Sequence, residues 1–419
     1  MFQSARRLLE ERESRRPRRA VRQIGAGLAL LAAGGPALAE EATSNTEGLF
    51  RGAFEAETRA LGERVSAASV QPEQQGPIIG GYIQFRYLST AFDDAGGEDF
   101  ANGFQLQRAR IIVRGSIGGD EEGGPTFDYL LLPFTGPSGT WSILDAWVRW
   151  RAEEHWTVQA GQFKLPFWRE WLISERFILP IERSEVTATY ASIYAQGVQV
   201  GFNDGNVRAN FAFSDGLRSF NTAFNNDAEA DYALTARGEY LAFGEWGQFS
   251  DATALNAEQD ALMFGAAVHH QGETESFRGA SIDHLTQATA DVSWEVGDLA
   301  LMAAGVVRLL EPSAGEEELS FGGLAQGGYM VREDLEVFGR YEFIVPDSDV
   351  IADDTYHAIT GGLNWYIRGH SAKLSVDAVY SFGPPDDTGV IGFGPNAGTG
   401  LLDGQDDQLA LRAQFQFIF

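Results

Sequence analysis

The chain has 419 residues and a formal net charge of −28 at neutral pH. The absence of cysteine excludes a disulfide framework and a zinc–cysteine site, and the strongly acidic balance argues against nucleic acid as a partner. After the N-terminal segment no run of about 18 apolar residues occurs, which excludes membrane-spanning helices.

Residues 1–39 have the layout of a secretory signal peptide. Basic residues run from Arg6 to Arg22, an apolar run covers 24–33, and Ala37-Leu38-Ala39 precedes the expected cleavage point. Ser14-Arg15-Arg16 faintly resembles a twin-arginine signal, but that route carries folded cargo. We therefore expect export by the general secretory route.

Residues 40–76 form a separate N-terminal segment. Between Thr46 and Ala68 apolar side chains recur at roughly helical spacing, which predicts a short, weakly amphipathic helix. We interpret the segment as a periplasmic appendage, a contact within a trimer or a plain linker.

From residue 77 to 419 the chain changes to short segments with strand-like alternation. About sixteen candidate strands begin near Ile78, Gly103, Thr126, Thr140, His155, Tyr194, Asn206, Ala230, Ala261, Leu285, Asp298, Phe321, Asp334, Thr355, Ala372 and Gln408.

The last candidate strand has the clearest pattern. One side of a period-two ribbon carries Leu409, Leu411, Ala413, Phe415, Phe417 and Phe419, and the other carries Gln408, Arg412, Gln414 and Gln416. Such an apolar face needs an apolar cover, which is either the core of a soluble β-sandwich or membrane lipid. The terminal phenylalanine also resembles the signal that outer-membrane proteins present to the barrel assembly machinery.

The lengths of the connections distinguish these two covers. Short turns at 153–154, 204–205, 297–298, 333 and 369–370 alternate with long polar loops at 91–102, 217–229, 311–319, 346–354 and 383–407. This alternation is typical of transmembrane barrels, which have short periplasmic turns and long extracellular loops. Two connections, 118–125 and 244–260, are long where a short turn is expected. The sequence therefore predicts an all-β fold, an antiparallel transmembrane β-barrel of about sixteen strands over residues 77–419.

Counting sides along the candidate strands separates apolar from basic residues. Leu144, Ala146, Val148 and Trp150, for example, are expected to face lipid. The same count places these arginines inside: Arg86, Arg108, Arg110, Arg114, Arg149, Arg151, Arg208, Arg237, Arg340 and Arg412. An arginine on the lipid face at the midplane would cost about 2–4 kcal/mol. We interpret the inward arginines as the lining of a pore or, alternatively, as partners of the wall carboxylates Asp145, Glu239, Glu336, Glu342 and Asp377.

The connection from Lys164 to Ala191 differs from the other loops. It contains several tryptophan, phenylalanine and proline residues among the basic residues Lys164, Arg169, Arg176 and Arg183. Because it is too apolar for a free loop, we expect it to fold into the barrel and constrict the pore. The alternative is a lobe on the surface.

Three motifs resemble those of the phosphate-selective porin O and P family. They are Gln107-Arg108-Ala109-Arg110, Gly161-Gln162-Phe163-Lys164-Leu165-Pro166-Phe167 and Gly362-Leu363-Asn364-Trp365-Tyr366. The resemblance covers most of 80–419 and implies a homotrimeric porin of the Gram-negative outer membrane, surrounded by lipid and lipopolysaccharide. It also implies an arginine-lined lumen that prefers small anions such as phosphate, with Arg108, Arg110 and Lys164 as wall and constriction positions.

The lysine content differs from that of well-known family members. Those carry lysine clusters, whereas this chain has only Lys164 and Lys373, which argues against high-affinity capture of phosphate. Passive permeation of anions stays the expectation. Because arginine remains charged at any working pH, we expect this selectivity to change little with pH.

Other functions have less support in the sequence. A barrel enzyme needs a Ser–His or Asp–His constellation, and none of the six histidines lies in a matching motif. We expect no cofactor and no metal site, because no cluster has ligand spacing. A general, weakly selective porin and a plugged structural barrel are the remaining alternatives.

Overall fold

The structure is a computed structural model that describes residues 77–94, 97–119, 124–191, 194–255, 257, 259–347, 355–382, 398–402, 405 and 407–419. The predicted signal peptide at 1–39, the N-terminal segment at 40–76 and most of the loop at 383–407 lie outside the described residues.

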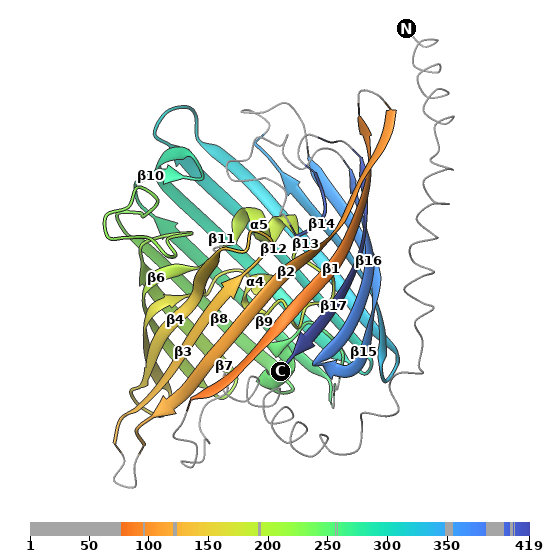
Figure 1. Ribbon diagram of the computed structural model, residues 1–419. Helices are drawn as coiled ribbons and strands as arrows, with labels where there is room; N and C mark the ends of the chain where they lie inside the picture. Colours follow the sequence, from red (N-terminus) through yellow and green to blue (C-terminus); the bar gives the residue numbers. More distant parts are fainter. Residues whose placement is uncertain are drawn as a thin grey trace. The chain divides into compact units, whose positions relative to one another are not determined.

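The described chain consists mainly of β-strands (Figure 1). In chain order they are β1 (Ile78–Asp94), β2 (Gly97–Ile117), β3 (Thr126–Thr135), β4 (Trp141–Arg151), β5 (Trp156–Phe163), β6 (Ala195–Asp204), β7 (Val207–Ser214), β8 (Ala233–Phe243), β9 (Ala261–Gln271), β10 (Thr274–Phe277), β11 (Ala280–Val296), β12 (Leu299–Pro312), β13 (Glu318–Arg332), β14 (Leu335–Val345), β15 (Tyr356–His370), β16 (Ala372–Phe382) and β17 (Gln408–Ile418). The helices are α4 (Arg169–Leu172), α5 (Glu185–Tyr190) and the 3-10 helix η1 (Trp246–Ser250). In the part of the chain that is described, no helix is both long and apolar enough to cross a membrane.

The strands form one closed antiparallel barrel. Neighbours in the chain pair from β1 to β9, β9 pairs with β11, and the series continues to β17, which pairs with β1 from Tyr82↔Ile418 to Ala91↔Leu409. The sheet has 17 strands in all, but β10 pairs only with the start of β11, so sixteen strands complete the circuit. Closure leaves no unpaired edge, as a membrane requires. The prediction of a sixteen-stranded barrel is confirmed, and all sixteen predicted starts lie near or inside a barrel strand.

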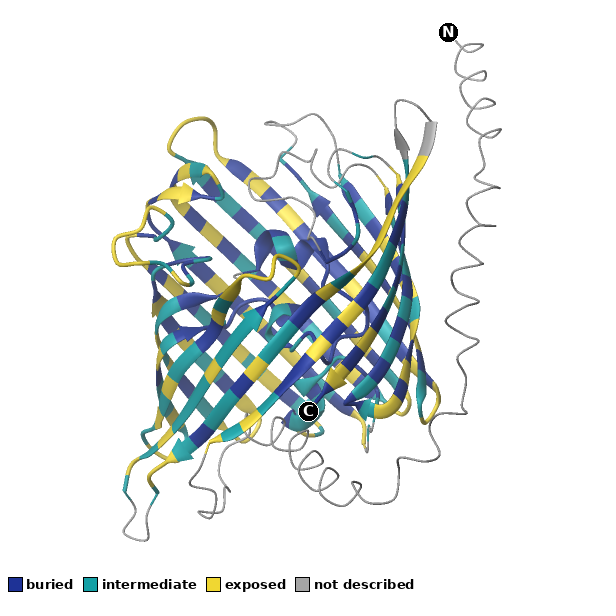
Figure 2. Ribbon diagram, viewed as in Figure 1, coloured by how far each residue is buried: buried dark blue, intermediate teal, exposed yellow. Residues whose placement is uncertain are grey.

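Burial alternates along the strands (Figure 2). In β17, Phe415 and Phe417 are 44% and 47% exposed, whereas Gln414 and Gln416 are buried. Since the wall is one residue thick, exposed apolar positions form its outer face and buried polar ones its inner face. The expectation that Leu144 faces outward is wrong. It is buried at a bulge, where the β3–β4 register shifts between Leu132 and Pro133.

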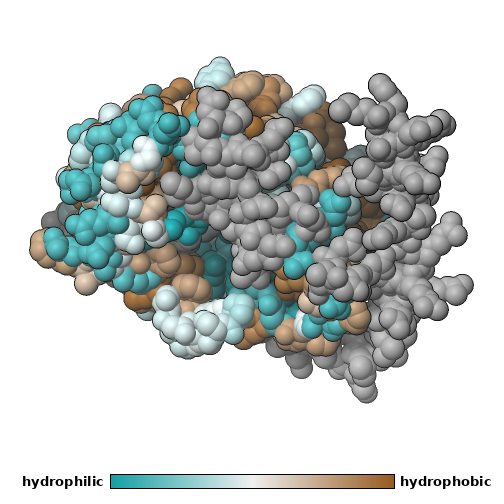
Figure 3. All heavy atoms as spheres, turned by 90° about the horizontal axis from the view of Figure 1, so that it is seen from above, coloured by the Kyte–Doolittle hydropathy of each residue, from teal (hydrophilic) through white to brown (hydrophobic). Residues whose placement is uncertain are grey.

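The two rims of the barrel differ as expected. The short-turn rim has the connections 152–155, 205–206, 297–298, 333–334 and 371, and two longer ones at 118–125 and 244–260. The predicted loop at 91–102 is wrong, because β1 and β2 pair through this region to Asp94↔Gly97 despite its polar composition. Likewise 311–319 shrinks to a connection at 313–317. Seen from above, hydrophilic residues gather on the long-loop rim and apolar residues appear around the outside (Figure 3).

Candidate functional site in the barrel interior

The connection between β5 and β6, residues 164–191, is here called the inward segment. Almost all of its side chains are buried, and it contacts inward-facing residues of widely separated strands. Arg169 donates to Ser293 of β11 at 3.3 Å, Asn364 of β15 donates to the Leu179 carbonyl at 3.0 Å, and Gln416 of β17 donates to the Arg176 carbonyl at 3.2 Å. Its backbone therefore lies against the inner face of the wall.

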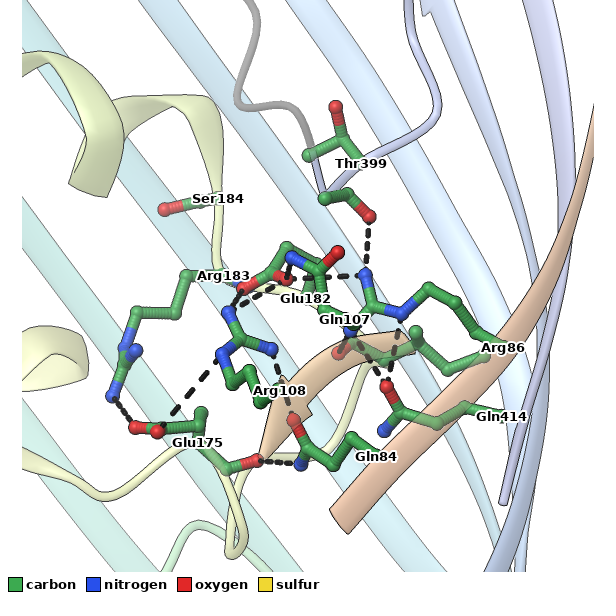
Figure 4. A network of polar contacts seen from close by, with 12 residues as sticks. Gln84, Arg86, Gln107, Arg108, Glu175, Glu182, Arg183, Ser184, Thr399 and Gln414 are labelled. Atoms are coloured by element: carbon green, nitrogen blue, oxygen red, sulfur yellow. Dashed lines mark hydrogen bonds and ion pairs between the residues drawn. The ribbon is translucent and has the colours of Figure 1, made fainter. Parts of the chain in front are cut away.

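Glu182 of the inward segment is the centre of one buried network (Figure 4). The Arg108 Nη2 atom lies 2.7 and 2.8 Å from its two carboxylate oxygens, Arg86 Nη1 lies 3.2 Å away, and Gln107 donates at 3.3 Å. Burial raises the pKa of Glu182, but the charges of Arg108 and Arg86 outweigh burial and hold the pKa well below its usual value. The carboxylate is therefore charged.

Glu175 forms a second centre, to the left of the first in Figure 4. Its carboxylate pairs with Arg110 and with Arg183 at 3.2 Å, lies 3.9 Å from Arg108 Nε, and accepts a hydrogen bond from Tyr82. Burial raises the pKa of Glu175 and the neighbouring guanidinium groups lower it, with a net shift well below its usual value. Together the two glutamates attach the inward segment to β1 and β2.

Glu170 attaches the inward segment to β14, the fourth strand from β1 round the barrel. Its carboxylate accepts hydrogen bonds from the Ser184 backbone at 3.1 Å, from Thr187 and from Arg340 of β14 at 3.1 Å. Ser184 caps α5 by accepting from the Thr187 backbone at 3.0 Å. Buried ion pairs thus hold the segment at β1, β2 and β14.

Several inward arginines pair with carboxylates of the wall itself. Arg237 lies 2.8 Å from Asp291 and 2.9 Å from Glu239, and Arg412 lies 2.6 Å from Asp377. The pairing alternative thus applies to Glu239 and Asp377, and also to Glu342, which lies 3.6 Å from Arg340. Glu336 instead accepts from Asn364 and Tyr366, and Asp145 accepts from Trp147 at 3.2 Å.

The ten arginines predicted inside the barrel fall into two groups. Almost completely buried are Arg86, Arg108, Arg208, Arg237, Arg340 and Arg412. Partly exposed are Arg110, Arg114, Arg149 and Arg151. Of the predicted basic residues of the inward segment, Arg169, Arg176 and Arg183 are buried and Lys164 is partly exposed. The side chains of Arg108 and Arg110 are similarly exposed, at 11% and 10%, and both pair with buried glutamates. Partly exposed cations outside these two pairs include Arg149 on β4 and Lys164 at the start of the inward segment.

Arg149 and Lys164 have aromatic and amide partners. Arg149 donates through Nε and Nη2 to Gln159 at 2.9 and 2.6 Å, and its guanidinium lies 4.7 Å from the centre of the Trp147 ring. The Lys164 ammonium donates to the Trp171 carbonyl at 2.8 Å and lies 4.9 Å from the centre of its ring. Among the described residues, no carboxylate lies within ion-pair distance of either cation. Burial, together with the charge of Arg183, lowers the pKa of Lys164 to about 7.

A second connection, 244–260, also contacts the interior. Trp246 donates to the Gly205 carbonyl at 2.8 Å, and Arg208 lies 4.0 Å from the centre of its ring. The Phe249 carbonyl accepts from Arg169 at 2.5 Å, and the Ala252 amide donates to the Phe177 carbonyl at 2.9 Å. The two connections therefore support each other from opposite rims.

Sequence reasoning missed Glu170, Glu175 and Glu182. A signal was present, because each stands beside an arginine in the chain, and a carboxylate carried into a cationic interior will pair there. It also missed the inward contacts of 244–260, for which Trp246 and Phe249 are the apolar signal. Within the described residues no group of three or more His, Cys, Asp or Glu side chains is arranged to hold a metal ion.

Known structures resemble this fold at low sequence identity. An anion-selective porin from Comamonas acidovorans is 14% identical with a TM-score of 0.57, covering 82% of this chain and 99% of that one. A trimer form of OmpT from Vibrio cholerae is 11% identical with a TM-score of 0.55, covering 82% of this chain and 100% of that one. OmpF of Salmonella typhi, in complex with daunomycin, is 13% identical with a TM-score of 0.55, covering 84% of this chain and 100% of that one. At these identities the likeness shows the fold alone. No curated protein sequence matches the chain.

A family model of phosphate-selective porins O and P matches residues 80–419, which is most of the chain and the whole of the barrel except its first residues. This match confirms the resemblance carried by the three sequence motifs. Together with the closed barrel, it places the protein in the outer membrane of a Gram-negative bacterium and makes it a channel rather than an enzyme. The chain belongs to the phosphate-selective porin O and P family.

Proposed function

We propose that this porin lets small anions, phosphate among them, diffuse passively through a water-filled pore. The selecting charges are those of Arg149 on the inner face of β4 and of Lys164 at the start of the inward segment. The proposal rests on Arg149 and Lys164. Both side chains are partly exposed in the barrel interior, and among the described residues neither has a carboxylate at ion-pair distance.

The ion-paired arginines have a different role in this proposal. A guanidinium shared with a buried carboxylate adds little net charge to the lumen, so Arg86, Arg237 and Arg412 stabilise the interior. The contribution of Arg151 to the charge of the lumen is intermediate, because it pairs with Asp128 at 2.6 Å but both side chains are partly exposed. Selectivity then depends on few cations rather than on the total number of arginines.

An anion would cross the pore by making weak contacts with several cationic side chains in turn. Guanidinium and ammonium donors replace part of the hydration shell of an anion, and several such sites let the ion move on. The inward segment and the connection 244–260 narrow the lumen in this proposal, and Arg169, Arg176 and Arg183 fix the inward segment in place.

We also infer a homotrimer in contact with lipid and lipopolysaccharide. The support is the trimer form in which OmpT from Vibrio cholerae was solved, together with the shared barrel fold. Chemical cross-linking of the protein in native membranes, read on a denaturing gel, tests this inference, and cross-linked species no larger than a monomer would contradict it.

Ion selectivity in a planar bilayer tests the proposed function. We expect the reversal potential under a KCl gradient to indicate anion preference, and Arg149→Gln to reduce that preference. Arg332→Gln is the matched control, because Arg332 is 63% exposed at the short-turn rim and should leave the potential unchanged. A potential indicating cation preference would overturn the proposal.

A general, weakly selective pore is the second candidate. It is favoured by the neutralisation of most inner arginines, including Arg308, which pairs with Glu318 at 3.0 Å. A reversal potential near zero in the wild type would select this candidate, and absence of conductance would indicate a plugged barrel.

A further inference from the structure

Two tryptophans and two cations lie where β4 and the inward segment meet, and are here called the cation–indole strip. It consists of Arg149, Trp147, Trp171 and Lys164. Trp147 and Arg149 lie on the inner face of β4, where they alternate with Val148 and Trp150, which are 50% and 42% exposed on the outer face. All four members of the strip are partly exposed.

Asp145 and Tyr194 join the two halves of the strip. The Trp147 indole donates to Asp145 at 3.2 Å, Tyr194 lies beside the same carboxylate, and the Tyr194 ring meets Trp171 edge-on at 5.8 Å. The strip therefore has a cation at each end, an indole next to each cation and a carboxylate in the middle.

This order of groups selects a type of solute. The central Asp145 repels a bound carboxylate from the middle of the strip, whereas Arg149 and Lys164 attract it to the ends. An aromatic ring attached to that carboxylate then lies against an indole, where ring contacts are favourable.

Inorganic phosphate can pair with the cations of the strip but makes no favourable ring contact with its indoles. It has no apolar part to place on Trp147 or Trp171. A carboxylate with an attached ring uses both the cations and the indoles.

We infer that the cation–indole strip is a binding site for aromatic carboxylates, and that the pore prefers them to inorganic phosphate and to small aliphatic carboxylates. This inference rests on the proposed anion pathway and names the solute class for it. It assigns Trp147 and Trp171 as the residues that determine this specificity.

Block of the chloride current in a planar bilayer tests the inference, with benzoate, acetate and phosphate as the added anions. We expect benzoate to reduce the current by half at a concentration roughly 2- to 10-fold lower than acetate or phosphate, the range expected for one ring contact. In Trp147→Leu and Trp171→Leu the three anions should become similar in the concentration that halves the current.

The matched control is Trp150→Leu, on the same strand but on the outer face, which should keep the benzoate preference. A benzoate effect no stronger than that of acetate in the wild type, or a preference that survives both inner tryptophan changes, would overturn the inference. The wild-type comparison decides even where a tryptophan variant does not fold. A wild-type reversal potential in KCl without anion preference would instead overturn the proposed function, so the failure of the inference and the failure of the proposed function are distinguishable.

Discussion

The Nη2 atom of Arg108 lies within 2.8 Å of both carboxylate oxygens of Glu182, so a wall strand and the inward segment share one buried ion pair. Arg86 binds the same carboxylate and also donates to the Gly398 carbonyl at 2.6 Å, which brings a third part of the chain to this point. The wall, the inward segment and residues 398–402 therefore meet around the Glu182 carboxylate.

Glu182→Gln should destabilise the protein strongly. The change leaves Arg86 and Arg108 buried without their shared negative charge, and breaking a buried pair costs about 3–5 kcal/mol. Denaturant unfolding in detergent, followed by the shift of the barrel on a denaturing gel, measures the loss. Asp334→Asn is the control, because its pair with Arg332 is exposed and should contribute under about 1 kcal/mol. Equal effects of the two changes would contradict the role given to Glu182.

Gly398→Ala should disturb the same network from the other side. A Cβ at this position would lie far inside contact distance of the Glu182 carboxylate, which Arg86 and Arg108 hold in place. We expect a loss of about 1–3 kcal/mol in unfolding free energy, as for other overpacked sites. Gly103→Ala provides the comparison, since no atom lies within 4 Å of the position that the added methyl group would take on β2. A Gly398→Ala barrel as stable as wild type would show that residues 398–402 can move away at no cost.

The arginines alone predict a selectivity that changes little with pH, but the lowered pKa of Lys164 changes this prediction, and anion selectivity should depend on pH through Lys164. Its pKa is lowered to about 7 by burial and by Arg183, so the ammonium is charged below this pH and neutral above it. We expect anion preference in a KCl gradient to fall as the pH rises through about 7. Lys164→Arg should remove the dependence, because a guanidinium keeps its charge. A pH profile that is unchanged in this variant would exclude Lys164 as the titrating group.

Trp246→Ala should loosen the connection 244–260. Trp246 is 8% exposed, and replacing a buried tryptophan by alanine costs about 3–5 kcal/mol. We expect faster cleavage of this connection in limited proteolysis, together with a lower unfolding temperature. Trp294→Ala removes a tryptophan that is 42% exposed on the outer face and should leave cleavage at 244–260 unchanged. If both variants are cleaved alike, Trp246 is not the anchor.

The barrel could be predicted because the patterns that indicate it lie within short stretches of sequence. Alternation along a strand such as β17, and the difference between short turns and long loops, are both visible in a single sequence. The hairpin of β1 and β2 could not be delimited, since backbone pairing from Ala91↔Phe100 to Asp94↔Gly97 needs no apolar side chain. Leu144 was placed on the wrong face because one bulged residue reverses the count of sides.

The interior was predictable only in part. Period-two counting places Arg108 and Arg110 inside, but it carries no information about which carboxylate they meet. Their partners Glu175 and Glu182 are more than 60 residues away in the chain, and only the folded inward segment brings them together. The lowered pKa of Lys164 could not be predicted either. Its partner Trp171 is close in sequence, but the pKa depends on burial and on Arg183, which only the folded inward segment places there.

The single-layer wall of β2 restricts how this gene can change in length. Deleting one codon between Gln107 and Arg114 would exchange the two faces of the strand beyond that point, so that guanidinium groups would enter hydrocarbon and aliphatic side chains would enter water. Each reversed arginine would add about 2–4 kcal/mol near the midplane, which is more than a marginally stable barrel tolerates. Insertions and deletions are therefore compatible with folding at the rims, or where a bulge absorbs the extra residue as at Leu144, and variation in length should accumulate at these places.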